Sequence, residues 1–176
     1  MVSLPIAALL VLTHSTPAPA QTPAPSAPAA VEYSDAYRLR AKVHKVGSFA
    51  MLPLAATEFW LGQSIYTTPN ESKKGAHVAV GTAIGTLFAV NTVTGVWNLV
   101  ESRHDPNGRT KRWVHAVLMM TADAGFLATA ALAPGENEGG RNNSSSLADQ
   151  RSRHRTVALG SLAVGTVGYL IMLINK

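Results

Sequence analysis

The chain alternates between long apolar runs and short polar segments. Residues 76–100 form the clearest run, with 25 positions that include no Asp, Glu, Lys or Arg. About 20 apolar residues in a helix are enough to span the hydrocarbon core of a bilayer. Three further runs, at 46–66, 113–133 and 156–174, are separated from one another by polar turns. The pattern predicts an all-α integral membrane protein, a four-helix bundle with up-down-up-down topology.

The first 37 residues differ in composition from the rest of the chain. An apolar run followed by an Ala-Pro-Ala triplet predicts a signal peptide over residues 1–20. The Pro- and Ala-rich stretch 21–37 predicts an extended linker, because it has too few large apolar side chains to form a core. Residues 38–176 are then the four-helix transmembrane domain.

Composition narrows the chemistry that the chain can perform. It is 47% hydrophobic and 14% charged, whereas soluble proteins have about 25% charged residues. It has no Cys, which excludes disulfides, thiolate-bound clusters, a Cys nucleophile and covalent c-type haem. The net charge of +5 comes from Lys and Arg beside the ends of apolar runs, which indicates anchoring in the lipid bilayer and not nucleic acid binding.

Four of the six histidines stand at the start of the four runs, one in each: His44, His77, His115 and His154. Consecutive spans run in opposite directions, so their first turns alternate between the two membrane faces. This predicts that His44 pairs with His115 on one face and His77 with His154 on the other. Each pair comes from diagonal helices, whose facing side chains build cofactor sites in bundles. Neutral imidazoles on opposite sides of a porphyrin are axial ligands of a haem iron.

Small and basic residues near these histidines suit a flat, anionic cofactor. Gly81 and Gly85 follow His77 at i+4 and i+8, which leaves room along one helical stripe. Basic side chains beside the histidines are predicted to bind the haem propionates. They are Lys45, Lys74, Arg112 and Arg155. Close helix packing and interface anchoring use the same residue types, so these features alone do not decide between the interpretations.

This placement of histidines over about residues 42–175 resembles the cytochrome b561 family. In that family four core helices supply two bis-histidine haems, the first helix pairing with the third and the second with the fourth. The resemblance implies two non-covalent haem b groups with metal ligands His44 and His115, and His77 and His154. It implies a membrane b-type cytochrome that carries electrons between a donor and an acceptor. Other membrane subunits are candidates for that donor and acceptor. Many members have six spans, and no stretch here matches a substrate site such as one for ascorbate. We therefore expect an electron carrier or subunit over a stand-alone enzyme.

Two other functional classes fit the same pattern of spans. A haem-free four-helix membrane protein would act as a scaffold or accessory subunit of a larger complex. A transporter or metal-ion channel would use the histidines and Asp123 as ligands, but its histidines would be divided between two faces and not gathered at the midplane. Haem absorption by the purified protein distinguishes a cytochrome from both of these classes.

Glu58 and Asp123 are the charged residues inside the predicted spans. A carboxylate at membrane depth is a functional candidate. Asp123 lies eight residues beyond His115, so we expect it between the two histidine levels. There it takes part in proton movement, or bonds to Asn91, Thr92 or Thr94 on a neighbouring helix. We expect Glu58 nearer the far face, within reach of water.

Two signals for orientation disagree. A cleaved signal peptide predicts a bacterial inner (plasma) membrane protein with its N-terminus outside. The Lys and Arg bias predicts the reverse, with nine on the N-terminal side of the membrane against six on the other. We follow the signal peptide, because basic residues near haem propionates are expected on both faces.

Overall fold

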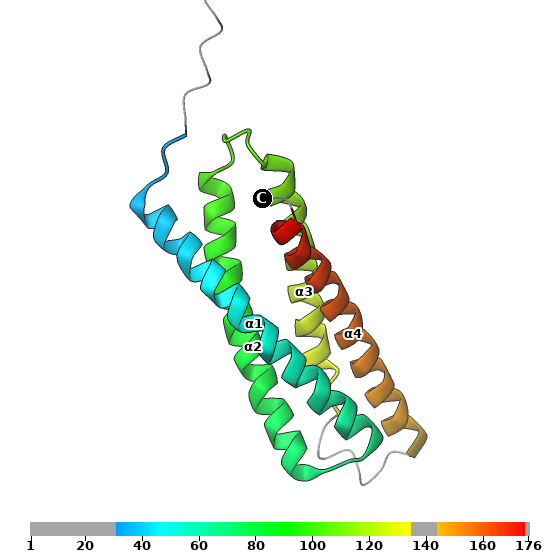
Figure 1. Cartoon of the computed structure of the whole chain (residues 1–176). Helices are drawn as coiled ribbons and strands as arrows, with labels where there is room; N and C mark the ends of the chain where they lie inside the picture. The colour runs from blue at the N-terminus through cyan, green and yellow to red at the C-terminus, as the bar shows by residue number, and fades with distance from the viewer. Residues whose placement is uncertain (1–30, 135–143, 175–176) are drawn as a thin grey trace, which may run out of the picture. The chain divides into compact units, whose positions relative to one another are not determined.

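A computed structural model describes residues 31–134 and 144–174, and within them the chain forms four α-helices and no strand. The helices are α1 (Asp35–Thr67), α2 (Glu71–Glu101), α3 (Arg109–Ala131) and α4 (Ser144–Ile174) (Figure 1). The all-α prediction is confirmed. The predicted signal peptide over residues 1–20 lies outside the described residues.

The helices extend beyond the apolar runs into the polar segments that flank them. α1 begins within the predicted linker 21–37, where the Ser34 side chain accepts a hydrogen bond from the Tyr37 backbone N–H at 3.0 Å. At the start of α2, Asn70 accepts from the Lys73 backbone N–H, also at 3.0 Å. α4 begins at residue 144, well before the predicted run at 156.

The helices pack as two antiparallel hairpins. α1 packs along α2, and α3 packs along α4, while the contacts of α2 with α3 and of α1 with α4 are sparser (Figure 1). Glycines allow close approach inside each hairpin. A Cβ on Gly47 would lie 2.5 Å from Asn91 Oδ1, and one on Gly125 would overlap the Ser161 hydroxyl. The arrangement leaves α1 diagonal to α3 and α2 diagonal to α4.

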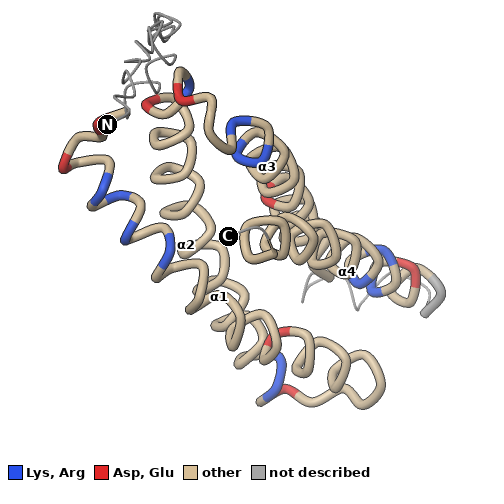
Figure 2. The backbone as a smooth tube through the Cα atoms, turned by 45° about the horizontal axis from the view of Figure 1, so that its top comes forward, with Lys and Arg blue, Asp and Glu red and all other residues tan. Residues whose placement is uncertain are grey.

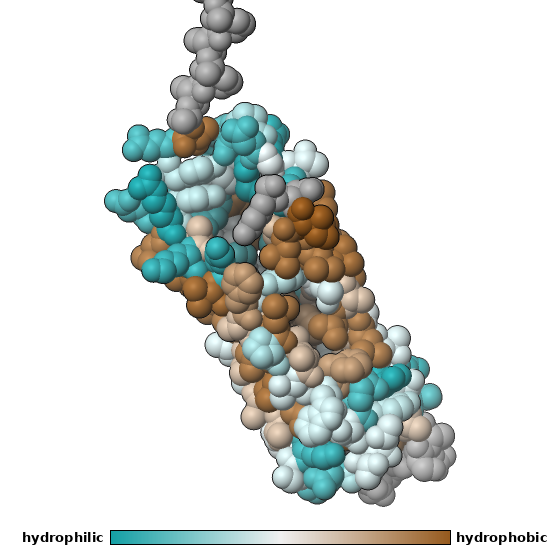
Figure 3. Space-filling view, in the orientation of Figure 1, coloured by the Kyte–Doolittle hydropathy of each residue, from teal (hydrophilic) through white to brown (hydrophobic). Residues whose placement is uncertain are grey.

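The helix surfaces are apolar over most of their length. Lys, Arg, Asp and Glu lie mainly near the helix ends (Figure 2), and the space-filling view shows an apolar zone between polar ends (Figure 3). Leu127 and Ile174 are 74% and 73% exposed, an arrangement that suits contact with lipid and not with water.

Among the described helices, α2, α3 and α4 are long and apolar enough to cross a membrane. The sequence also predicts a span in α1, over residues 46–66, but α1 falls outside this group. Its run includes Pro53, Glu58 and Gln63, which lower its hydropathy. Length and composition alone therefore support three spans.

Candidate cofactor-binding site

The structure brings the four predicted histidines together in the expected pairs. The ring centres of His44 on α1 and His115 on α3 lie 6.1 Å apart, with an angle of 81° between the ring planes. The ring centres of His77 on α2 and His154 on α4 also lie 6.1 Å apart, at 74°. Each pair joins diagonal helices and therefore connects one hairpin to the other.

This separation lies in the ordinary range for edge contacts between two rings, and it is also compatible with two imidazoles on opposite sides of a single metal ion. A metal–imidazole bond is about 2 Å long and the ring centre lies about 1.2 Å beyond the nitrogen, which places two such ring centres roughly 6.3 Å apart. The observed 6.1 Å agrees within a few tenths of an ångström.

Three of the histidines are oriented by a backbone carbonyl of the other helix in their own hairpin. His44 Nδ1 lies 2.9 Å from the carbonyl oxygen of Asn91, and His115 Nδ1 lies 2.9 Å from that of Gly168. His154 Nδ1 lies 2.8 Å from the carbonyl oxygen of Thr129. A carbonyl oxygen only accepts, so Nδ1 donates its proton and Nε2 keeps an unprotonated lone pair. This is the tautomer that binds a metal through Nε2, and metal-ligating histidines usually have such a partner.

The fourth histidine has a carboxylate in the equivalent place. His77 Nδ1 lies 2.9 Å from Glu58 Oε1 on α1. The carboxylate oxygen is not aligned with the ring N–H as in a hydrogen bond, so the contact is a close approach of a carboxylate oxygen to the ring nitrogen. His77 and Glu58 are 27% and 23% exposed. Glu58 thus lies against a histidine near the far end of α1, and its contact with water stays a prediction.

Each helix carries a histidine and also a group that contacts the histidine of a neighbouring helix. The spacing between the two is the same in all four helices. The partner groups belong to the residues 14 positions after the histidines, which are Glu58, Asn91, Thr129 and Gly168. Fourteen residues are about four helical turns and roughly 21 Å of rise, so both positions lie near one face. Each helix therefore contributes a histidine at one level and a supporting group at the other.

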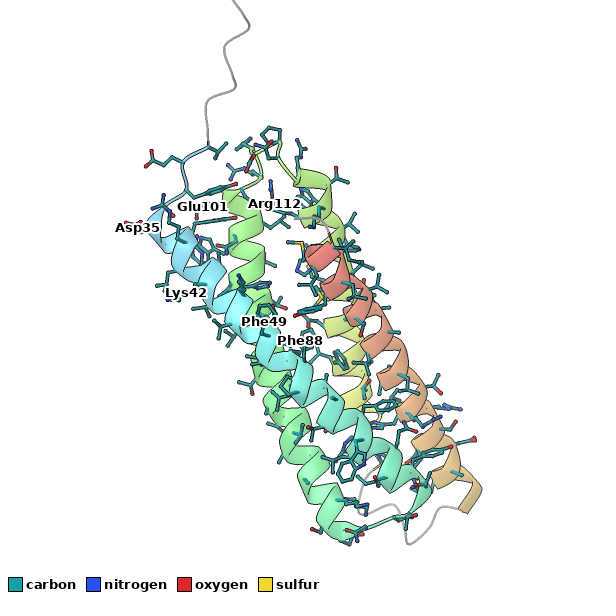
Figure 4. The ribbon with its side chains drawn as sticks, in the orientation of Figure 1. Asp35, Lys42, Phe49, Phe88, Glu101 and Arg112 are labelled. Carbon is teal, nitrogen blue, oxygen red and sulfur yellow. The ribbon has the colours of Figure 1, made fainter. Side chains whose placement is uncertain are left out.

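Aromatic side chains lie between the two histidine levels. The ring centres of Phe88 and Phe126 are 5.1 Å apart, and those of Phe49 and Tyr169 are 6.4 Å apart. Phe49 and Phe88 lie near the middle of the helices (Figure 4). Phe88 is among the few apolar side chains that are buried in the described part of the chain.

Glycines on the neighbouring helices, and not those on the predicted stripe, border the imidazole rings. A Cβ on Gly95 would lie 2.9 Å from His44 Cε1, whereas one on Gly62 would lie 3.5 Å from His77 Cε1. Of the two predicted glycines, Gly81 lies beside Glu58, and a Cβ on Gly85 would have no neighbouring side chain within 4 Å. That Gly81 and Gly85 leave room for a porphyrin stays a prediction.

The predicted propionate-binding residues lie at the helix ends, and three have protein partners. Lys74 pairs with Glu71 at 2.9 Å. Arg155 donates to Gln63 Oε1 at 2.9 Å, and Arg112 donates to carbonyl oxygens of the α2–α3 turn. Lys45 is exposed. Their contact with propionates stays a prediction.

A polar network connects the start of α1 to the end of α2 and the α2–α3 turn, at the end of the bundle nearer to His44 and His115. The Tyr33 hydroxyl donates to Asp105 in the α2–α3 turn, and Arg40 on α1 pairs with Glu101 on α2. Burial and the hydrogen bond to Asp105 raise the pKa of Tyr33 to about 12. The same hydrogen bond, with the Asn107 backbone N–H, lowers the pKa of Asp105 below its usual range.

We expect Tyr33→Phe to destabilise the fold in a pH-dependent way. The lowered pKa of Asp105 gives stability that is present above its ordinary pKa and lost as the pH falls through the folded value. The raised pKa of Tyr33 gives stability that is present below pH 10 and lost as the pH rises towards 12. Unfolding free energies across pH should show a plateau in the wild-type advantage between about pH 5 and pH 9. Tyr37→Phe, in the ring stacked on Tyr33, is the matched control. An advantage of Tyr33 that does not change with pH would contradict this assignment.

Asp123 bonds to one of the three partners expected from the sequence. The Thr92 hydroxyl on α2 donates to Asp123 Oδ2 on α3. The carboxylate therefore links the two hairpins within the apolar parts of α2 and α3.

No protein-family model, curated protein or solved structure matches this chain. Within residues 31–134 and 144–174, no group of three or more His, Cys, Asp or Glu side chains gathers as a metal site. The candidate site therefore consists of two sets of paired imidazoles.

Proposed function

We propose that the protein is a membrane b-type cytochrome that carries electrons through two non-covalent haem b groups. His44 and His115 would hold one haem, and His77 and His154 would hold the other. The observation on which the proposal depends is the 6.1 Å separation of both ring pairs, together with the partner atom beside each Nδ1.

The donor set fits a haem. Each site offers two neutral imidazoles, so a bound metal ion would need its remaining ligands from another group. A porphyrin would supply four nitrogens for this purpose. Both pairs join the two hairpins, between which helix contacts are sparser than within them. A cofactor between the hairpins would therefore separate surfaces that make few contacts of their own.

A bound haem would supply a one-electron Fe(III)/Fe(II) couple at each level. The chain's own contribution is to orient the imidazoles, through carbonyls for three and a carboxylate for the fourth, and to keep water from the sites with apolar side chains. Two pairs of aromatic rings, Phe49 with Tyr169 and Phe88 with Phe126, pack against each other along the bundle.

The proposed topology has four spans, with α1 crossing the bilayer beside α2. α1 packs along α2, so a membrane crossed by α2 would also enclose the apolar part of α1. With the N-terminus outside a bacterial inner membrane, an even number of spans places Lys176 outside. Alkaline phosphatase fused after Lys176 should be active, and activity only of a cytoplasmic reporter at that position would overturn the orientation.

A redox difference spectrum of membranes tests the proposal. Membranes that contain the chain and adequate haem should give a b-type reduced-minus-oxidised spectrum. The matched control is the His115→Ala/His154→Ala double variant, which removes one ligand of each pair and should abolish the signal. The absence of a chain-dependent spectrum from the wild type would favour a haem-free scaffold, and an identical spectrum from the double variant would show that these histidines are not the haem ligands.

A further inference from the structure

The two histidine pairs have the same separation between ring centres, but the groups beside their Nδ1 atoms differ in charge. At three Nδ1 atoms the partner is a neutral backbone carbonyl, and at His77 it is the Glu58 carboxylate. Because the four partners stand at one repeated spacing, the other three helices serve as an internal comparison for Glu58. At this repeated position the partner is charged in α1 and a neutral backbone carbonyl in the other three helices.

The neighbouring helix leaves space for the carboxylate. A Cβ on Gly81 would lie 3.0 Å from Glu58 Oε1, which is closer than nearly all real Cβ contacts. Gly81 follows His77 by one helical turn, so the absence of its side chain lets Glu58 reach the ring. The second oxygen, Oε2, is buried and has no hydrogen-bond partner.

No Lys or Arg side chain in the described part of the chain forms an ion pair with Glu58. The acidic residues of the helix ends differ in this respect, since Glu101 pairs with Arg40 and Glu71 with Lys74. The contact of the Glu58 carboxylate within the described residues is therefore with the His77 imidazole.

We infer that Glu58 makes the two haem sites unequal, giving the His77/His154 site a lower reduction potential than the His44/His115 site. The inference rests on the proposed function. A carboxylate beside Nδ1 increases the basicity of the ligand nitrogen, and a nearby negative charge favours the ferric over the ferrous ion. Both effects lower the potential of the site that Glu58 contacts. In a partly reduced protein the His44/His115 site is then the one that is mostly reduced.

A spectroelectrochemical titration of the purified protein tests the inference. The wild type should resolve two components, and His154→Ala should remove the lower one. Glu58→Gln keeps the shape of the side chain but removes the charge. It should raise the lower component by at least a tenfold change in the one-electron equilibrium, about 59 mV, and leave the higher one unchanged. Thr94→Val is the matched control, because the Thr94 hydroxyl is a neutral group 3.4 Å from His44 Nδ1.

Several outcomes would overturn the inference while leaving the proposed function intact. One is a lower component that His115→Ala removes and His154→Ala spares. Another is a Glu58→Gln protein whose components are unchanged or shift equally. The wild-type order of potentials decides the matter even if Glu58→Gln impairs folding. A wild-type protein without haem would instead refute the proposed function itself.

Discussion

Replacing His44 with Ala should remove one of two bound haems, and replacing His115 should remove the same one. The two ring centres lie 6.1 Å apart across the hairpins, so either replacement would leave that site with a single protein ligand. The double replacement should lose little more than either single one, because the two residues act on one site. His77→Ala and His154→Ala should remove the other haem.

Haem per chain and the redox spectrum of the four single variants measure this result. Each single variant should retain about half of the wild-type haem. His104→Ala is the matched control, since His104 is exposed in the α2–α3 turn. The pairing is refuted if His44→Ala and His77→Ala abolish the same spectral component while His115→Ala spares it.

Gly95→Ala should weaken haem binding at the His44/His115 site by roughly 10- to 100-fold, the usual effect of disturbing a group that orients a metal ligand. The new Cβ would lie 2.9 Å from His44 Cε1 and 3.2 Å from Nδ1. The ring would have to move away from the Asn91 carbonyl that orients it at 2.9 Å. The His77/His154 site should keep its haem.

Gly62→Ala is the matched control for this substitution. It places the same methyl group beside the imidazole of the other site, but at 3.5 Å from His77 Cε1, an ordinary contact distance. Both variants gain the helix propensity of Ala, so that effect cancels in the comparison. Equal haem retention by the two variants would show that Gly95 does not position His44.

The pairing of histidines is predictable from the sequence because it depends only on the direction of successive helices. Apolar runs indicate the order and approximate length of the spans, and the first-turn histidines then alternate between levels. The boundaries are less accurate, since α1 and α4 continue into polar segments whose residues also form helix. The sequence likewise predicts an apolar span for α1, although Glu58, Pro53 and Gln63 lower its hydropathy.

The groups that orient the histidines are not predictable from residue type, for a physical reason. Every residue has a backbone carbonyl, so residue type does not mark Asn91, Thr129 or Gly168 as partners. Glu58 is visible as a charge inside a span, but its contact with His77 depends on the register of α1 against α2. The regular offset of 14 residues appears only once the contacts are known, because the four residues at that offset are of four different types.

The glycines show the same limit. The sequence favours Gly81 and Gly85 because they share a helical stripe with His77. The close approach to His44 instead involves Gly95 on the facing helix, and Gly81 makes room for Glu58. Contacts between helices, which a stripe on one helix does not describe, decide which glycines matter.

The haem content of the purified wild-type chain, expressed with added haem, decides whether the protein is a cytochrome. We expect about two haems per chain, released by acidic organic solvent because the chain has no Cys to attach them covalently. A purified, folded protein that stays colourless after haem supplementation would contradict the cytochrome assignment.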